Sequence, residues 1–298
     1  MRDLDLTSLR LFTRVCETRS ITLAAAQENI VGSAISKRLA QLEHTVGTPL
    51  LIRKRRGVEP TPAGETLLEH ARQMLASTER IARDMGAYAA GVRGQVRILA
   101  TASVMAESLA DDVAAFLHDP AHRDIQVDLE ERLSPDVLRG VREGTASLGI
   151  CWDASRLGGL QSSPYRSDHL AIVTHADHPL AERQTLCFAD TLAYAHVSLP
   201  VASAVQVMLQ REAAKLGRVL TTRVIVSNFE AALRVVRANL ALSVVPEEVA
   251  TPFATAYGLR VMPLTDVWAK RRFAICCRDE AGLSKAAGLL LGHLRGMA

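Results

Sequence analysis

The stretch from residue 20 to residue 43 constrains the fold more than any other part of the chain. Its sequence, SITLAAAQENIVGSAISKRLAQLE, predicts two short helices joined by a tight turn, with Ser33 capping the second. In that second helix, Ile35, Leu39 and Leu42 have the spacing of a helix that is buried on one face. The other face carries small hydroxyls and bases, which suit a polyanion, and we interpret it as a DNA recognition helix. Its DNA-facing residues would be Ser33, Ser36, Lys37 and Arg38.

The segments on both sides of this stretch complete a DNA-binding unit. Another amphipathic helix is expected from about residue 4 to 17, with Asp5 or Thr7 as its cap, and Ser20 or Thr22 caps the helix that follows it. Downstream, residues 50–52 predict a short strand that returns through Val58 after a basic tip, which is the pattern of a β-wing. A basic tip is by itself compatible with a solvated loop, but after two helices and a turn it favours phosphate or minor-groove contact. Its bases are Arg53, Lys54, Arg55 and Arg56.

A long helix is predicted over residues 61–91. Thr61 is its expected cap and Pro62 its first residue, and apolar residues then recur at spacings of three and four. About 30 residues give a rod on the order of 45 Å. Pairing with the same helix of a second subunit buries such a stripe better than packing against the chain's own body. Residues 91–95 are expected to form a hinge.

Beyond the hinge, short strands and helices alternate, which predicts an α/β body with a mainly parallel sheet. A second block begins near Tyr165, and the chain then returns through an alternating strand into a final helix. Two such units indicate a two-lobed body with a cleft between the lobes. The expected domains are residues 1–60 (DNA binding), 61–91 (linker helix), 95–164 with 268–298 (first lobe) and 165–267 (second lobe).

Charge and cysteine content narrow the function further. The 298 residues carry a net charge of +3, but residues 1–64 hold ten Lys and Arg against six Asp and Glu, so a basic end precedes a near-neutral body. Five cysteines without framework spacing argue against a disulfide scaffold, and no Cys/His pattern has zinc spacing. The N-terminus lacks an apolar secretory core and no apolar run has membrane-spanning length, so a cytoplasmic protein without metal or cofactor is expected.

These motifs resemble the LysR-type transcriptional regulators over essentially the whole chain. The N-terminal likeness lies in LRLFTRVCETRSITLAAA, SAISKRLAQLE and VGTPLLIRKRRGVEPTPAGETLLEHAR, and the body follows in LEERLSPDVLRGVREGTASLGI, LAIVTHADHPLA and SNFEAALRVVRANLALSVVPEEVA. The resemblance implies an all-α, winged helix-turn-helix N-terminal domain and a dimerising linker helix. It also implies a two-lobed effector domain like the periplasmic binding proteins, in homodimers that pair into tetramers.

The chain departs from the family pattern at three places. Val31-Gly32 stands where Ser/Thr-Gln is common, so a glutamine that reads a base edge is absent. Glu28 stands where a core leucine is usual, and Asn239-Leu240-Ala241 stands where the family has Gly-x-Gly. Specificity is therefore expected to depend on the remaining residues of the recognition helix and on DNA shape.

The resemblance also implies an effector site at the strand-to-helix junctions between the lobes. Helix N-termini favour anions, so a carboxylate or another anion is the expected effector. Taken singly, each hydroxyl there is equally well explained as a helix cap, and Trp152 equally well as cleft lining or as core. The matching positions are Thr101, Ala102, Ser103, Ser134, Ser198, Val201, Ser227, Asn228 and Phe229.

Three other functions fit the residues less well than regulation by an effector does. An enzyme is not expected, because no nucleophile elbow, phosphate loop or dinucleotide motif is present. A solute-binding protein would lack the basic N-terminal unit, and a thiol-based redox regulator would need a suitable cysteine pair, for which only Cys187 is roughly placed. The expected partners are double-stranded promoter DNA, a small effector, further copies of the chain and RNA polymerase.

Overall fold

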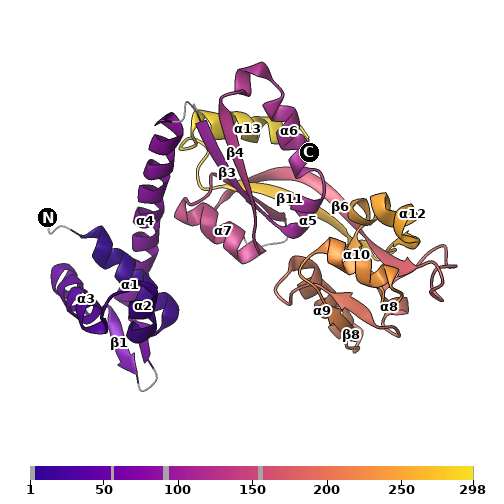
Figure 1. Cartoon of the computed structure of the whole chain (residues 1–298), viewed down its shortest axis with the longest axis horizontal. Coiled ribbons are helices and arrows are strands. Elements are labelled where there is room, and N and C mark those ends of the chain that lie inside the picture. Colours follow the sequence, from indigo (N-terminus) through magenta and orange to yellow (C-terminus); the bar gives the residue numbers. More distant parts are fainter. Residues whose placement is uncertain (1–3, 55–56, 90–93, 154–156, 298) are drawn as a thin grey trace. The chain divides into compact units, whose positions relative to one another are not determined.

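The computed structural model describes residues 4–54, 57–89, 94–153 and 157–297. They fall into two compact units, of which one holds the chain up to Ala90 together with Arg142–Thr145 and the other holds the rest. Figure 1 labels the elements of both units. No helix within the described ranges combines the length and the apolarity that crossing a membrane requires.

The first two helices begin at side-chain caps that the sequence offers locally. Helix α1 (Leu6–Thr18) starts where the Asp5 carboxylate accepts hydrogen bonds from two backbone N–H groups of the first turn. Helix α2 (Ile21–Gln27) starts where Ser20 Oγ accepts one from the Leu23 N–H, at 3.3 Å. Each cap satisfies donors that the helix itself leaves free.

Helix α3 (Gly32–Val46) differs at its start from the sequence prediction. Val31 occupies the cap position and makes no side-chain hydrogen bond there, so Ser33 lies inside the helix and does not cap it. The apolar stripe is as predicted, since the three side chains facing the core are buried: Ile35, Leu39 and Leu42. They join residues of α1, α2 and the wing in one hydrophobic cluster.

The wing consists of β1 (Leu51–Lys54) and β2 (Gly57–Pro60), paired antiparallel. It is docked on the end of α1, because the Val58 N–H donates to the carbonyl of Arg19 at 3.0 Å. A Cβ atom on Gly57 would lie 2.3 Å from that same carbonyl oxygen, and φ at this glycine is +113°. A side chain at residue 57 would therefore force the wing away from α1.

Helix α4 (Pro62–Ala89) is the predicted long helix, and its 28 residues correspond to about 42 Å. It begins at Thr61, whose Oγ1 accepts from the Gly64 N–H at 3.0 Å. Its first turns pack into the core of the first unit through Ala71. Farther along the helix, apolar side chains are exposed: Met74, Ile81 and Met85.

A seven-stranded sheet runs through the second unit in the order β10-β6-β11-β5-β3-β4, with β9 beside β6. The predicted parallel arrangement holds for β3 with β4 and β5, but β6, β9, β10 and β11 pair antiparallel, so the sheet is not mainly parallel. The physical reason is that β6 leaves the first lobe and β11 returns to it, so the two must run in opposite directions. The strands are β3 (Gly94–Ala100), β4 (Ile125–Glu131), β5 (Leu148–Trp152), β6 (Gln161–His175), β9 (Ser243–Pro246), β10 (Leu259–Pro263) and β11 (Lys270–Cys277).

Helices cover this sheet, and a short parallel pair, β7 (His196–Ser198) with β8 (Thr222–Ile225), completes the second lobe. The helical stretch after β3 is interrupted at residues 107–108, and the one after β9 is interrupted around Pro252, which has no N–H to continue the ladder. The helices are α5 (Ala102–Ala106), α6 (Leu109–Leu117), α7 (Ser134–Glu143), α8 (Phe188–Thr191), α9 (Ala204–Lys215), α10 (Phe229–Arg237), α11 (Glu247–Ala250), α12 (Ala254–Tyr257) and α13 (Lys285–Arg295), with 3-10 turns at Pro120–His122, Thr251–Phe253 and Val267–Ala269.

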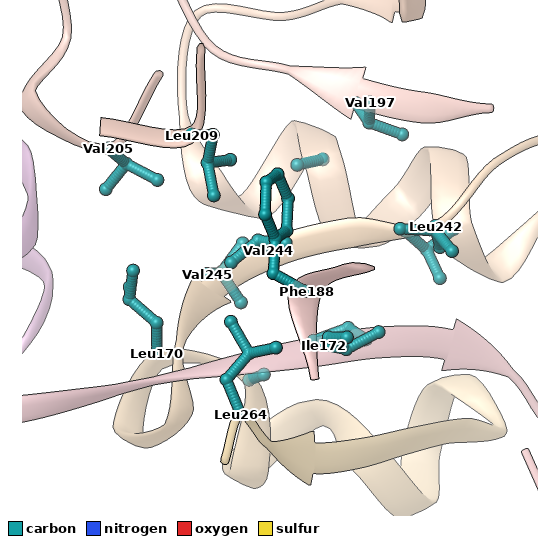
Figure 2. Packing of buried hydrophobic residues seen from close by; sticks show 14 of the residues in the cluster. Leu170, Ile172, Phe188, Val197, Val205, Leu209, Leu242, Val244, Val245 and Leu264 are labelled. Carbon is teal, nitrogen blue, oxygen red and sulfur yellow. The ribbon is translucent and has the colours of Figure 1, made fainter. Parts of the chain in front are cut away.

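Each lobe has its own hydrophobic core, and β6 contributes to both. Tyr165 packs into the core of the first lobe, whereas Leu170, five residues later, packs into the core of the second, which Figure 2 shows with Phe188 at its centre. On β11, Phe273 belongs to the first core, and Ala269, just before the strand, belongs to the second. The predicted boundary after residue 164 therefore falls inside one continuous strand.

The predicted hinge at residues 91–95 lies partly outside the described residues, and its remainder is strand. Gly94 and Gln95 open β3. A Cβ atom on Gly94 would lie 2.7 Å from the Cβ of Ala286 on α13. The glycine thus permits close packing of helix on strand, and it does not serve as a hinge residue.

Candidate functional site

The exposed face of α3 carries the predicted DNA-contacting residues. Ser33 and Lys37 are exposed and Ser36 is half-buried, on the side away from the buried stripe. Arg38 is exposed but engaged, because its Nη1 lies 2.9 Å from Asp5 Oδ2 at the cap of α1. Hydrogen bonds from the Ser8 hydroxyl and backbone N–H, with a smaller effect of Arg38, lower the pKa of Asp5. The pair therefore joins the recognition helix to α1.

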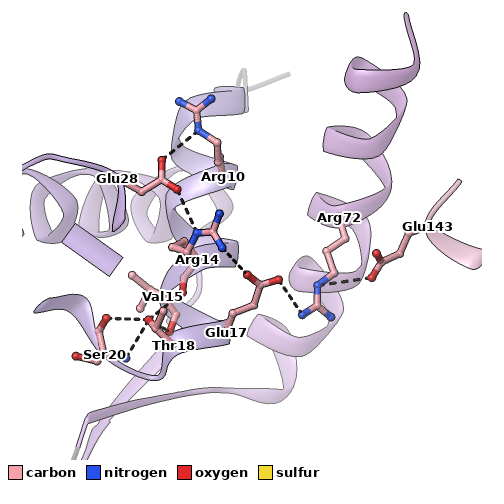
Figure 3. Close-up of polar contacts among 9 residues, drawn as sticks. All are labelled: Arg10, Arg14, Val15, Glu17, Thr18, Ser20, Glu28, Arg72 and Glu143. Atoms are coloured by element: carbon pink, nitrogen blue, oxygen red, sulfur yellow. Dashed lines mark hydrogen bonds and ion pairs between the residues drawn. The ribbon is translucent and has the colours of Figure 1, made fainter. Parts of the chain in front are cut away.

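Glu28 does not fill the core position that a leucine would take. Its carboxylate lies 3.2 Å from Arg14 Nε and 3.6 Å from Arg10 Nε, both on α1 (Figure 3). Arg14 also pairs with Glu17, which in turn lies 3.5 Å from Arg72 on α4. Polar contacts thus replace the apolar contact between α1 and α2 at this point.

The wing presents bases beside the recognition helix. Arg53 and Lys54 are both exposed on β1, and Lys54 Nζ lies 3.5 Å from Glu59 across the hairpin. Both members of that pair are about half exposed, so it competes weakly with a phosphate. The other two predicted bases, Arg55 and Arg56, lie outside the described residues.

A cavity of about 640 Å³ opens in the second unit at the strand-to-helix junctions. Its volume is in the range of small-molecule sites. Both lobes contribute to it, since α5 and α7 belong to the first lobe and α10 to the second. Seven of the nine predicted effector residues line it: Thr101, Ala102, Ser103, Ser134, Ser227, Asn228 and Phe229.

The other two predicted residues do not line the cavity. Ser198 is 3% exposed, and its hydroxyl is hydrogen bonded to Thr222 Oγ1 at 2.7 Å, so it ties β7 to β8. Val201 is 64% exposed in the turn after β7. The lining in this region comes instead from Leu199, Pro200 and Ser203. The structure thus brings other residues of this loop to the cavity than the two that were predicted.

The sequence reasoning also missed two parts of the cavity lining. Residues 131–133, at the end of β4, form one part, and the other part consists of Glu248, Val249, Pro252 and Phe253. Residues 131–133 lie at the end of a strand, just as Thr101 and Ser227 follow the ends of theirs. Their position at a strand end could therefore have identified them from the sequence. The contribution of 248–253 depends on how α11 packs, and no local pattern marks it.

Hydrogen bonding distinguishes the polar side chains of the lining. Asn228 Oδ1 caps α10 by accepting from the Ala231 N–H at 2.9 Å. Ser103 Oγ accepts from Arg271 Nη2 at 3.0 Å. Ser134 Oγ, at the start of α7, is buried and has no hydrogen-bond partner among the described residues. A buried hydroxyl without a partner costs free energy, and a ligand in the cavity can relieve that cost.

A buried ionic group lies behind this wall, where β6 and β11 pass between the lobes. Arg271 is 1% exposed, and it donates from Nε to Asp168 Oδ1 at 2.8 Å and from Nη2 to Asp168 Oδ2. Glu107, just after α5, has a buried Oε1 without a partner among the described residues. Burial, and then the negative charge of Asp168, raise the pKa of Glu107 to about 9, so this carboxyl is protonated at neutral pH.

Two family models match the chain. The model described as LysR substrate binding domain matches residues 89–298, and the model described as bacterial regulatory helix-turn-helix protein, lysR family, matches residues 6–65. The chain belongs to the LysR-type transcriptional regulators. Members of this family regulate transcription and are not enzymes, and the matched helix-turn-helix excludes a solute-binding protein for transport.

Two full-length relatives match this LysR-type regulator along nearly all of its length, and one isolated domain matches about two thirds of it. The uncharacterized regulator YbhD of Escherichia coli K12 is 24% identical over 286 residues, which cover 95% of this chain and 88% of YbhD. The crystal structure of CbnR, a LysR family regulator, matches with a TM-score of 0.65 at 22% identity, covering 99% of both chains. The effector binding domain of QuiR, in complex with shikimate, matches with a TM-score of 0.60 at 17% identity, covering 68% of this chain and 96% of that domain. At these identities the structures establish a shared fold.

A reactive, redox-sensing cysteine is accessible and has a low pKa. Burial raises the pKa of Cys16 to about 11 and also raises the pKa of Cys187 and of Cys277. A hydrogen bond with Cys151 and burial raise the pKa of Cys276. Cys276 and Cys277 point to opposite faces of β11 and pack into different clusters. Across the described residues, no group of three or more His, Cys, Asp or Glu is arranged to hold a metal ion.

Proposed function

We propose that this regulator binds promoter DNA as an oligomer and that a small molecule in the inter-lobe cavity controls its activity. The cavity carries the proposal, because its size and its position at helix N-termini of both lobes suit a ligand that bridges them. The complex of QuiR with shikimate supports this proposal by its fold likeness. Effector binding would change the lobes' arrangement and thereby the spacing of paired recognition helices along the DNA.

The DNA contacts are proposed to come from two places in the first unit. Ser33, Ser36, Lys37 and Arg38 on α3 would face base edges in the major groove, and the wing bases Arg53 to Arg56 would contact phosphates. The structure of CbnR with its target DNA supports this use of the shared fold, with a TM-score of 0.64. Because Val31 supplies no side-chain cap to α3, a phosphate could bind in place of a cap at the start of this helix.

Self-association is proposed to involve α4. Its exposed apolar residues Met74, Ile81 and Met85 fall at spacings of seven and four, which places them on one stripe. A second copy of the same helix would bury that stripe. Contact with RNA polymerase would follow from the position of the bound oligomer on the promoter.

The proposal is tested by footprinting the full-length regulator on DNA fragments selected from its own genome. A thermal-shift screen of small molecules first identifies ligands, because a compound that binds only the folded state raises its melting temperature. We expect a saturating ligand from that screen to change the length or the bending of the footprint. A footprint that stays the same with every stabilising ligand would contradict control through the cavity.

A further inference from the structure

The charged side chains that line the cavity are mostly acidic. Within the described part of the chain, four carboxylates contribute to the lining and one base does, and a cavity of this kind carries a net negative charge unless the acids are neutralised. The sign of the charge in a cleft decides which ligands enter it. The four acids are Glu131, Asp136, Glu230 and Glu248, and the base is Arg132.

The single base of the lining is already engaged. Arg132 forms an ion pair through Nη2 with Glu130, and its Nη1 donates to the carbonyl oxygen of Glu131 at 3.3 Å. Glu130 also pairs with Arg97, so these charges form a small network outside the cavity. A ligand carboxylate that paired with Arg132 would compete with Glu130 for its guanidinium.

The second nearby guanidinium is no more accessible. Arg271 donates to both oxygens of Asp168 and to Ser103 Oγ, and it is 1% exposed. The adjoining Glu107 stays protonated, because burial and then the negative charge of Asp168 raise its pKa. The wall behind the cavity therefore offers no unpaired positive charge among these residues.

The acids of the lining are more available than its base. Glu131 and Glu248 are exposed and make no ion pair with any residue that the structure describes. Asp136 pairs with Arg139, and Glu230 lies 2.7 Å from Arg234, but both partners sit outside the lining on the solvent side of their own helices. Exposed pairs of this kind contribute little and are easily exchanged.

The rest of the lining is largely apolar, and aromatic faces are part of it. Hydrocarbon side chains from both lobes form this surface, and a phenyl ring attracts a cation over its face. A buried hydroxyl that lacks a partner, Ser134 Oγ, adds one hydrogen-bonding position. The apolar residues include Leu133, Leu199, Val205, Phe229, Val249 and Phe253.

We propose that the ligand of this cavity is an amine, with a protonated nitrogen facing Glu131 and Glu248 and an apolar body facing the phenyl rings. This inference rests on the proposed effector function of the cavity and replaces the anionic ligand that the helix N-termini alone suggest. A carboxylate attracts a nearby cation and repels a nearby anion, and both effects are stronger in a partly shielded site than in bulk water.

Three probes that share a 2-phenylethyl group and differ in their polar end test the proposal. 2-Phenylethylamine, 3-phenylpropanoate and 3-phenylpropanamide present an ammonium, a carboxylate and a neutral amide on a similar phenylalkyl body. Each is titrated into the full-length regulator by calorimetry and by thermal shift. We expect the amine to bind at least tenfold more tightly than the carboxylate, with the amide in between. Tighter binding of the carboxylate, or no binding of the amine, would overturn the proposal.

Substitution of single lining carboxylates then tests which of them contact the amine. Glu248→Gln and Glu131→Gln are each expected to weaken amine binding about fivefold or more, because each removes a carboxylate and keeps the shape of the side chain. Glu182→Gln is the matched control, since Glu182 is exposed in a loop and does not line the cavity. Equal amine affinity in all three variants would place the amine elsewhere and overturn the proposal.

Different results would contradict the amine proposal and the proposed effector function. If the carboxylate binds and shifts the footprint, the cavity remains an effector site and only the amine is wrong. If none of the three probes binds, the amine proposal is overturned, and the effector function then depends on the wider ligand screen and its footprints.

Discussion

The proposed DNA-binding surface and the ligand cavity differ in how the chain builds them. The described part of the DNA-binding surface lies within residues 31–54, on one helix and one strand, whereas the cavity collects residues from Thr101 to Phe253. The first surface carries bases and is held to α1 by exposed ion pairs such as Arg38 with Asp5. The second carries acids and is backed by a buried ion pair, Arg271 with Asp168. The loss of one partner should therefore cost little stability at the exposed ion pair and much more at the buried one.

Removal of one partner from each ion pair measures that difference directly. Arg271→Met leaves Asp168 buried without its cation, and we expect the free energy of unfolding to fall by about 3–5 kcal/mol. Arg38→Met exposes Asp5 to water, where the loss should be at most about 1 kcal/mol. Urea denaturation of both variants provides the values. Similar losses would contradict the contrast between the two regions.

Protonation of Glu107 makes the stability of the effector region depend on pH. This group has a pKa of about 9 in the folded chain against 4.5 as its ordinary value, so the unfolded chain loses the proton first. The free energy of unfolding should therefore decrease as the pH rises between these values, by up to about 1.4 kcal/mol per pH unit. Glu107→Gln should remove this slope while keeping the neutral shape. Parallel pH profiles of variant and wild type in urea denaturation would contradict it.

A side-chain cap at the start of α3 should stabilise the DNA-binding region, because the natural residue there, Val31, supplies none. Val31→Ser supplies the missing cap, and the free energy of unfolding of the first unit should rise by about 1 kcal/mol. Val31→Ala is the matched control, because alanine shortens the side chain without supplying an acceptor. Thermal and urea melts distinguish the two. Identical melts for both variants would show that another group already satisfies the start of the helix.

The wing should contribute to affinity mainly through salt-sensitive contacts. For Arg53→Ala we expect the slope of log K against log salt to become shallower by about one, with sequence preference unchanged. Fluorescence anisotropy on a selected duplex at several salt concentrations measures it. Arg123→Ala is the control, since Arg123 is 80% exposed in the second unit. A slope that matches this control would place Arg53 away from the phosphates.

Local signals predicted the first unit well. The caps at Asp5 and Ser20, the stripe of α3 and the start of α4 at Thr61 all depend on residues within a few positions of one another. The error at Ser33 came from expecting a polar cap where the chain has Val31. A hydrophobic residue at that position does not stop the helix from starting, because the packing of its stripe supplies most of its stability.

The second unit was predicted less completely because its features depend on distant pairing. The order of strand-to-helix junctions placed Thr101, Ser134 and Asn228 at one cavity. The strand β10, by contrast, was missed, and its pairing partner β6 begins almost a hundred residues earlier in the chain. The acidic character of the lining was missed too, because Glu131 and Glu248 come from different lobes and line one cavity only after both lobes have folded.

The two strands shared by both lobes, β6 and β11, have a consequence for how such a domain is inherited. Strand β6 supplies side chains to both cores, and β11 supplies the first core directly after Ala269 has joined the second, so a recombination breakpoint inside either segment would join halves whose packing was selected separately. The register of Arg271 opposite Asp168 adds a further constraint, since both residues must arrive together. The lobes are therefore expected to be exchanged between related regulators as a pair, and ligand preference is expected to diverge by substitutions in the cavity wall.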